Sequence, residues 1–139
     1  MRTKDITLVQ EAIDQYAEQI EGLDLPEWLA NPSNVALTNE YRDVALFERQ
    51  WRHPDVVCGH YFFHSRGKQA REEAKKMLKE IFTGPYFVKN VTGFTPVDNK
   101  GALWMNRQLG FTDLGTVDAP TGECKYVYLT KSDWILNNE

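Results

Sequence analysis

The chain has 139 residues, of which 42% are hydrophobic and 26% are charged, which suits one folded domain over residues 1–139 and excludes a disordered chain. Its net charge of −4 argues against a nucleic-acid-binding protein, because such proteins usually present a basic face. No apolar run reaches the length of a membrane span, and the N-terminus MRTKDITLVQ lacks the apolar core of a secretory signal. Two cysteines and three histidines without metal-ligand spacing predict buried thiols and no metal site. We therefore expect a cytoplasmic protein that works away from membranes.

The first half of the chain predicts two helices and then three strands. A helix over residues 7–22 has apolar residues on one face and a capping box formed by Thr7 and Gln10. The short helix PEWLAN follows it. The strands are NVALTNEY, DVALFERQW and VVCGHYFF, separated by polar turns that include His53-Pro54-Asp55. These three strands predict an antiparallel meander.

The second half predicts a strand–helix–strand unit and a terminal hairpin. A long helix with one apolar face follows the turn HSRG and ends at Thr83-Gly84-Pro85. The strand YFVKNVTGFTP comes next, then a shorter helix over 99–109, capped by Asp98 or Asn99 and stopped by Gly110. FTDLGTVD and ECKYVYLT form a hairpin around APTG, and a polar tail ends the chain. A strand–helix–strand unit joins two parallel strands, so the fold class is a mixed α/β sheet flanked by helices.

The turn before the long helix, HSRGKQAR, has the composition of an anion site. Arg66 and Lys68 supply positive charge, and Gly67 lets a ligand approach the backbone. The amides of residues 67 to 71 are unpaired donors at a helix start. The turn therefore predicts a pyrophosphate site; the alternative is an ordinary turn leading into a solvated, charged helix face.

A second motif, NKGALWMNRQLGF, stands at residues 99–111. Asn99, Ala102, Gly110 and Phe111 occupy the fixed positions of the pattern N-x-x-A-x-x-x-Y-x-x-x-G-F. The motif comes after a strand, the basic glycine turn, a long helix and a second strand, and a terminal hairpin follows it. With its elements in this order over residues 35 to 130, the chain resembles the GNAT superfamily of N-acetyltransferases. It looks most like the small GNAT-like proteins that bacteriophages encode. That family normally opens with a strand, for which this chain offers only MRTKDI.

The resemblance implies acetyl-CoA as the cofactor. The pyrophosphate would lie on the glycine turn and the pantetheine arm against the end of the preceding strand, where two parallel strands splay apart. The implied cofactor contacts are Tyr61, Phe62, Phe63, Arg66, Gly67, Lys68, Gln69, Ala70, Arg71, Asn99 and Asn106.

The sequence departs from the family pattern at two places. The family turn reads Q/R-x-x-G-x-G/A. Counted from Arg66, Gln69 and Arg71 stand where glycines usually admit the phosphates; counted from His64, Gly67 fits and Gln69 stands at the last position. Asn106 replaces a tyrosine that protonates the departing CoA thiolate in many members. An amide cannot act as that general acid.

A general base has two candidates, each of which has a purely structural alternative. His60 has an ordinary pKa of about 6.5, close to the working range of a base. Glu48 lies on the neighbouring strand. Cys58 lacks a residue nearby in sequence that would activate it as a nucleophile.

Two functions remain open at this stage. The first is an acetyl-CoA-dependent N-acetyltransferase that acts on an amine of a small molecule or protein. Asp118, Glu123 and the acidic first helix favour a basic acceptor. The second is a GNAT-shaped phage protein without catalysis that binds a virion or host protein, in the host cytoplasm. The departures at Gln69, Arg71 and Asn106 favour this second function.

Overall fold

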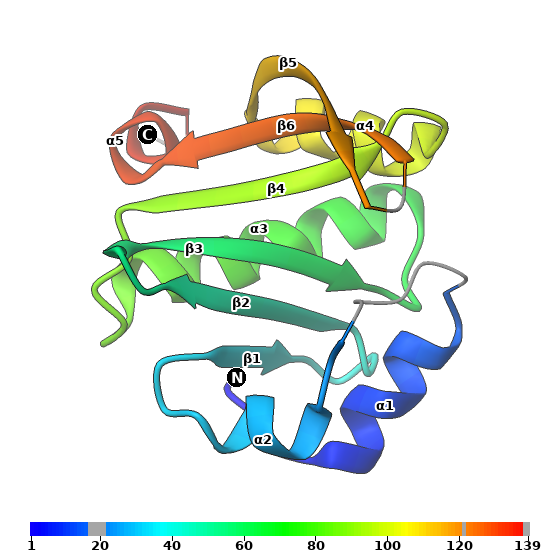
Figure 1. Ribbon diagram of the computed structural model, residues 1–139, viewed down its shortest axis with the longest axis vertical. Coiled ribbons are helices and arrows are strands. Elements are labelled where there is room, and N and C mark those ends of the chain that lie inside the picture. The colour runs from blue at the N-terminus through cyan, green and yellow to red at the C-terminus, as the bar shows by residue number, and fades with distance from the viewer. Residues whose placement is uncertain (17–21, 121, 138–139) are drawn as a thin grey trace.

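The computed structural model describes residues 1–16, 22–120 and 122–137. One six-stranded sheet, in the order β1-β2-β3-β4-β6-β5, forms the centre of the molecule, and helices cover both of its faces (Figure 1). The strands are β1 (Val35–Thr38), β2 (Val44–Gln50), β3 (His53–Phe62), β4 (Asn90–Pro96), β5 (Thr112–Ala119) and β6 (Gly122–Thr130). The helices are α1 (Ile6–Asp14), α2 (Leu25–Ala30), α3 (Gly67–Thr83), α4 (Lys100–Leu109) and α5 (Lys131–Asn137).

The sheet confirms the predicted mixture of antiparallel and parallel strands. β1, β2 and β3 form the antiparallel meander, and α3 connects β3 to its parallel neighbour β4. β4 pairs antiparallel with β6, which pairs antiparallel with β5 in the terminal hairpin. The strand–helix–strand unit therefore lies at the centre of the sheet.

The parallel pairing of β3 and β4 is short. It consists of Val56 with Asn90, Val57 with Val91, and Cys58 with Thr92. β3 nevertheless continues to Phe62, paired with β2, and β4 continues to Pro96, paired with β6. Beyond Cys58 and Thr92 the two strands have no pairing with each other, so a gap opens in the middle of the sheet.

Two apolar clusters lie on opposite faces of the sheet. The apolar face of α3 packs on one side, where Met77, Leu78 and Ile81 meet Phe47 and Val57. On the other side, α1 and α2 pack against side chains of β1 and β2. Successive residues of a strand point to opposite faces. This alternation explains why the continuous apolar runs VAL and VALF are buried on both sides.

The structure corrects several predicted boundaries in the first half of the chain. Asp5, not Thr7, caps α1, and its carboxylate accepts from the amide of Leu8 at 3.1 Å. This helix ends at Asp14, and residues 17–21 of the predicted helix lie outside the described residues. β3 begins at His53, within the predicted turn, because His53 pairs with Gln50 across a hairpin at Trp51 and Arg52. The predicted first strand MRTKDI contributes one bridge, between Arg2 and Leu37.

The prediction of a polar tail at the end of the chain is wrong, because residues 131–137 form helix α5. The ring of Trp134 packs on Phe82 of α3, with ring centroids 5.6 Å apart. Gly110, which ends α4 as predicted, has a φ of 86°. A Cβ at this position would lie 2.6 Å from Nδ2 of Asn137. Gly110 thus serves both the left-handed end of α4 and the packing of α5 against it.

The carboxylate of Asp43 fixes the segment between β3 and α3. This residue is fully buried at the start of β2. Its Oδ1 accepts hydrogen bonds from the amides of His64 (2.7 Å) and Ser65 (2.8 Å). Its Oδ2 accepts from Oγ of Ser65 (2.7 Å) and Nδ2 of Asn39 (3.0 Å). One side chain therefore holds the basic turn against the β1–β2 connection.

We expect Asp43→Ala to lower the free energy of unfolding by about 3 kcal/mol, because it leaves several buried donors without an acceptor. Urea denaturation measures this loss. The control is Asp118→Ala, which removes an exposed carboxylate and should change the stability by less than about 0.5 kcal/mol. Equal losses in the two variants would contradict the role given to Asp43.

Candidate functional site

The gap between β3 and β4 leaves backbone groups of β3 without a partner strand. The hydroxyl of Thr92 on β4 donates to the carbonyl of Val57 (3.4 Å), which therefore faces the β4 side. Because strand residues alternate in the direction of their amides, Gly59, Tyr61 and Phe63 face the same side. A Cβ on Gly93 would lie 3.8 Å from the carbonyl oxygen of Gly59, so the two backbones are close at the closed end of the gap.

Tyr16 closes the open end of this strand edge. Its hydroxyl donates to the carbonyl of Phe63 (2.6 Å) and accepts from the amide of the same residue (3.0 Å). The backbone groups left for a ligand are therefore the carbonyl of Gly59 and the amide and carbonyl of Tyr61. The side chains of Phe62 and Phe63 are buried, so this strand end offers its backbone more than its aromatic rings.

The first turn of α3 lies directly beyond the gap and has no side-chain cap. Within the described chain, the amides of Gly67, Lys68 and Gln69 have no hydrogen-bond acceptor. Gly67 has a φ of 57°, and a Cβ there would have no atom within 4 Å. Unpaired amides at the positive end of a helix bind anions. The structure thus places unpaired amides at the turn where the sequence predicts an anion site.

The basic side chains of this turn point in different directions. The guanidinium of Arg66 donates to the carbonyls of Phe63 and Ser65 and lies over the ring of Tyr16, 5.9 Å from its centroid. It therefore stabilises the end of β3. Arg71 donates to Gln108 of α4 at 3.2 Å and pairs with Glu72 at 3.3 Å.

The remaining residues of the turn differ in exposure. Lys68 and Gln69 are exposed at the start of α3, whereas Ala70 is buried against the core. Of Arg66, Lys68 and Arg71, Lys68 is the one for whose side chain the described residues provide neither an ion-pair partner nor a hydrogen-bond acceptor. An anion at the open amides would therefore meet the charge of Lys68 first.

The two asparagines of the second motif are both engaged by the protein. Oδ1 of Asn99 accepts from the amide of Ala102 at 3.1 Å and so caps α4, as the sequence predicts. Nδ2 of Asn106 donates to Oγ1 of Thr95 at 2.9 Å and ties α4 to the end of β4. Asn106 thus helps to hold the far side of the gap.

The two candidate bases lie together on the face of the sheet that α1 and α2 cover, opposite the face that α3 covers. Glu48 pairs with Cys58 across β2 and β3, and His60 is two residues further along β3 on the same face. Oε1 of Glu48 accepts from Nε1 of Trp28 at 3.2 Å. Burial lowers the pKa of His60, and the charge of Glu48 partly opposes this shift. His60 is therefore neutral at pH 7, the state a base requires.

Other chemistry is poorly supported in the part of the chain that the structure describes. Burial raises the pKa of Cys58 to about 11, so its thiol remains protonated at neutral pH. His, Cys, Asp and Glu residues form no group of three or more that suits a metal ion within the described ranges. Among these residues, no helix is long and apolar enough to cross a membrane.

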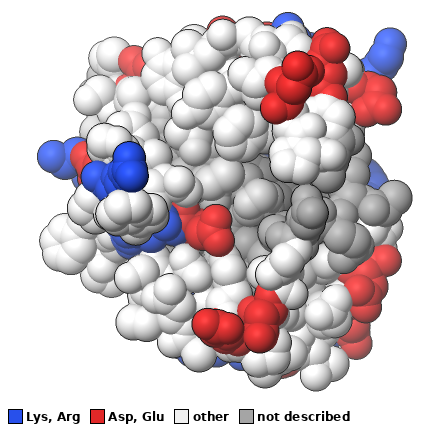
Figure 2. Space-filling view, in the orientation of Figure 1, with Lys and Arg blue, Asp and Glu red and all other residues white. Residues whose placement is uncertain are grey.

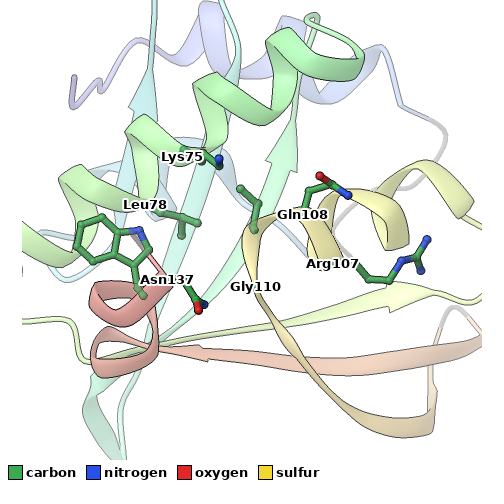
Figure 3. Close-up of a pocket in the computed structure, with 8 residues that line it drawn as sticks. Lys75, Leu78, Arg107, Gln108, Gly110 and Asn137 are labelled. Carbon is green, nitrogen blue, oxygen red and sulfur yellow. The ribbon is translucent and has the colours of Figure 1, made fainter. Parts of the chain in front are cut away.

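A cavity of about 170 Å³ lies among helices α3, α4 and α5, away from the gap (Figure 3). None of its lining residues belongs to β3, β4 or the first turn of α3. The lining residues are Lys75, Leu78, Arg107, Gln108, Leu109, Gly110, Trp134 and Asn137. We therefore do not include it in the candidate site.

Sequence reasoning missed Asp43 and Tyr16, because their roles depend on contacts with a distant turn. Asp43 looks like the first residue of a strand, and Tyr16 looks like one more apolar position on a helix face. Their hydrogen bonds to residues 63–65 hold the end of the strand edge and the segment that leads into α3. No local pattern in the sequence identifies either residue.

Together these features suit an extended ligand with an anionic group at one end. The anion would lie on the first turn of α3, and a flexible arm would bind the backbone of β3 in the gap. The other end of the arm would then reach the face that bears His60 and Glu48.

Comparison with known proteins places this geometry in a fold. No family model and no curated protein matches the chain. The solved structure of aminoglycoside acetyltransferase AAC(6')-Ib with coenzyme A is 17% identical, with a TM-score of 0.71 over 99% of this chain and 96% of that one. Spermidine N-acetyltransferase SpeG from Vibrio cholerae is 12% identical, with a TM-score of 0.76 over 99% and 95%. At such identities the likeness shows the fold alone: this chain has the mixed α/β fold of the GNAT acetyltransferases.

Proposed function

We propose that this protein is an acetyl-CoA-dependent N-acetyltransferase. The observation that carries the proposal is the gap between β3 and β4, which ends at the uncapped start of α3. Coenzyme A has a pyrophosphate joined to a long arm with amide groups. The open helix start matches the pyrophosphate, and the gap matches the arm. The chain's resemblance to the GNAT superfamily and its shared fold support the same function.

The residues present fit this cofactor. The amides of Gly67, Lys68 and Gln69, together with the charge of Lys68, would hold the phosphates. The backbone groups of Gly59 and Tyr61 would bind the amides of the arm. When bound, the cofactor supplies the acetyl group as an activated thioester. Fixing both reactants in one geometry supplies much of the rate in such reactions.

His60 is the base that this geometry favours. Its imidazole is neutral at pH 7 and lies on the face opposite α3, next to the charge of Glu48. It would accept the proton that the acceptor nitrogen loses. Glu48 is exposed and hydrogen-bonded to Trp28, which suits it to orienting an acceptor amine.

We propose a small polycationic amine as the acceptor. Acidic side chains lie over α1, α2 and the middle of the sheet on this face, and most of its Lys and Arg side chains gather at one edge (Figure 2). Asp118 and Glu123 are exposed partners on the β5–β6 hairpin. The solved neighbours act on spermidine and on aminoglycosides, which are polycationic amines. Attraction between opposite charges would draw such an acceptor to this face.

The second candidate is a phage protein of the same shape that binds a virion or host protein in the host cytoplasm without catalysis. The observation that favours it is Asn106, whose amide donates to Thr95 and offers no O–H at the position of the family's tyrosine. Release of free CoA in the presence of a polyamine or aminoglycoside, with an acetylated product detected by mass spectrometry, would exclude this candidate. Binding of acetyl-CoA without any product would favour it.

A charge reversal at each end of α3 tests the phosphate site. We expect Lys68→Glu to weaken acetyl-CoA binding about tenfold, because it places a negative charge beside the open amides. Lys79→Glu makes the same change near the other end of the helix and should alter the affinity less than about twofold. Calorimetric titration measures both. Equal affinities in the two variants would place the phosphates elsewhere.

A pH profile distinguishes the two candidate bases. Above the pKa of His60, we expect wild-type kcat/KM to exceed that of His60→Gln by about 100-fold. This advantage should disappear as the pH falls through a pKa below the ordinary value of about 6.5, because the protonated imidazole accepts no proton. The ratio of the two enzymes cancels the titration of the acceptor itself. The opposite result, in which Glu48→Gln loses this rate and His60→Gln keeps it, would make Glu48 the base.

A further inference from the structure

The phenol oxygen of Tyr61 is buried and has no hydrogen-bond partner in the described part of the chain. Its ring packs edge-on against Phe47 and Phe63, at 6.0 Å between centroids in each pair. An unpaired buried hydroxyl is costly, and phenylalanine would fill the same space without that cost. The hydroxyl therefore needs an explanation beyond packing.

This hydroxyl lies at the closed end of the gap. Gly59 is the first residue of β3 beyond the last pair with β4, Cys58 with Thr92. A Cβ built on Gly59 would lie 3.3 Å from the phenol oxygen of Tyr61 and 3.4 Å from Cγ1 of Val91. The donor thus sits against the backbone where the two strands part, on the face that α3 and α4 cover.

Helix α4 contains no residue with a hydroxyl group, so it supplies no O–H donor on this side. Asn106 takes the position at which the resemblance places a tyrosine, and its amide nitrogen already donates to Thr95. A thiolate that leaves at the bottom of the gap would be a strong acceptor for an O–H group, because hydrogen bonds to charged groups are the stronger ones.

We propose that Tyr61 is a catalytic residue whose phenol donates a hydrogen bond to the sulfur of the departing CoA thiolate. This inference rests on the acetyltransferase function proposed above. The acceptor nitrogen forms its bond to the acyl carbon, the carbon–sulfur bond breaks, and sulfur keeps the bonding electron pair. The surplus proton of the nitrogen leaves through the base to solvent, and the free thiolate later takes a proton from solvent.

Tyr61 keeps its own proton in this step. Burial raises the pKa of its phenol above the ordinary value of about 10, whereas a thiol has a pKa of about 8.5. Transfer of the phenol proton to sulfur would therefore be uphill. Donation of a hydrogen bond stabilises the negative charge on sulfur without forming a buried phenolate.

A thermodynamic cycle of two ligands and two proteins tests this contact by binding. The ligands are CoA and an analogue in which hydrogen replaces the thiol group, both titrated above the thiol pKa. We expect Tyr61→Phe to weaken the binding of CoA about tenfold and the binding of the analogue less than twofold. Tyr86→Phe is the control, because Tyr86 is half-buried near Glu80, outside the site, and should bind both ligands like the wild type.

Two further measurements complete the test. The first uses only the wild-type protein and follows the ultraviolet absorbance of the bound CoA thiolate as the pH is raised. The pKa of the bound CoA thiol should lie below its free value of about 8.5. Tyr61→Phe should lower kcat at least tenfold at an unchanged KM for acetyl-CoA, and its Tm should not fall, since the hydroxyl has no protein partner to lose.

The outcomes separate this inference from the function on which it rests. If neither ligand binds the wild-type protein, the proposed acetyl-CoA-dependent function is wrong and this inference with it. If both ligands bind, and Tyr61→Phe weakens them equally or not at all, the role of Tyr61 is overturned while the function stands. A bound thiol whose pKa rises would also overturn it.

Discussion

The early end of the β3–β4 pairing is the constraint on which the site depends. Buried backbone groups need hydrogen-bond partners, and a gap within a sheet leaves such groups exposed to whatever enters it. Beyond the last pair, each strand keeps its partner on its other side, so the two strands diverge as parts of two antiparallel units. β3 is paired with β2 up to Phe62, and β4 is paired with β6 up to Pro96.

Side chains from distant parts of the chain define the two ends of this opening. Tyr16 occupies the amide and carbonyl of Phe63, and Asp43 binds the amides of His64 and Ser65. These contacts leave a short free edge at Gly59 and Tyr61 and fix the direction in which α3 begins. The helix start then presents its unpaired amides at a set distance from the strand edge. A fixed relative placement of strand edge and helix start lowers the entropic cost of binding an extended ligand that spans both.

The proposed chemistry is divided between the two faces of the sheet. The neutral imidazole of His60 lies on the acidic face under α1 and α2, whereas the phenol of Tyr61 lies on the face under α3 and α4. Successive residues of one strand thus reach opposite sides of the same gap. An acceptor amine can approach from one face while the leaving group is stabilised from the other. Asn106, which lacks the proton of a tyrosine, then has a structural role through Thr95.

The sequence by itself determined the features that arise within one segment. The apolar periodicity of residues 70–82 gives α3, Asn99 and Gly110 give the ends of α4, and the basic glycine turn gives the start of α3. A strand, helix and strand in order give the parallel pair at the centre of the sheet. These predictions succeed because capping, periodicity and crossover handedness act over short stretches of chain.

Only the tertiary structure decided the features that depend on distant partners. α5 forms where a polar tail was predicted, because Trp134 packs on Phe82. β3 begins within a predicted turn because His53 pairs with Gln50. Arg66 points at Tyr16 and the carbonyl of Phe63, and the hydroxyl of Tyr61 lies without a partner beside Gly59. Each of these depends on which surfaces meet after the chain folds, and spacing along the sequence does not encode that directly.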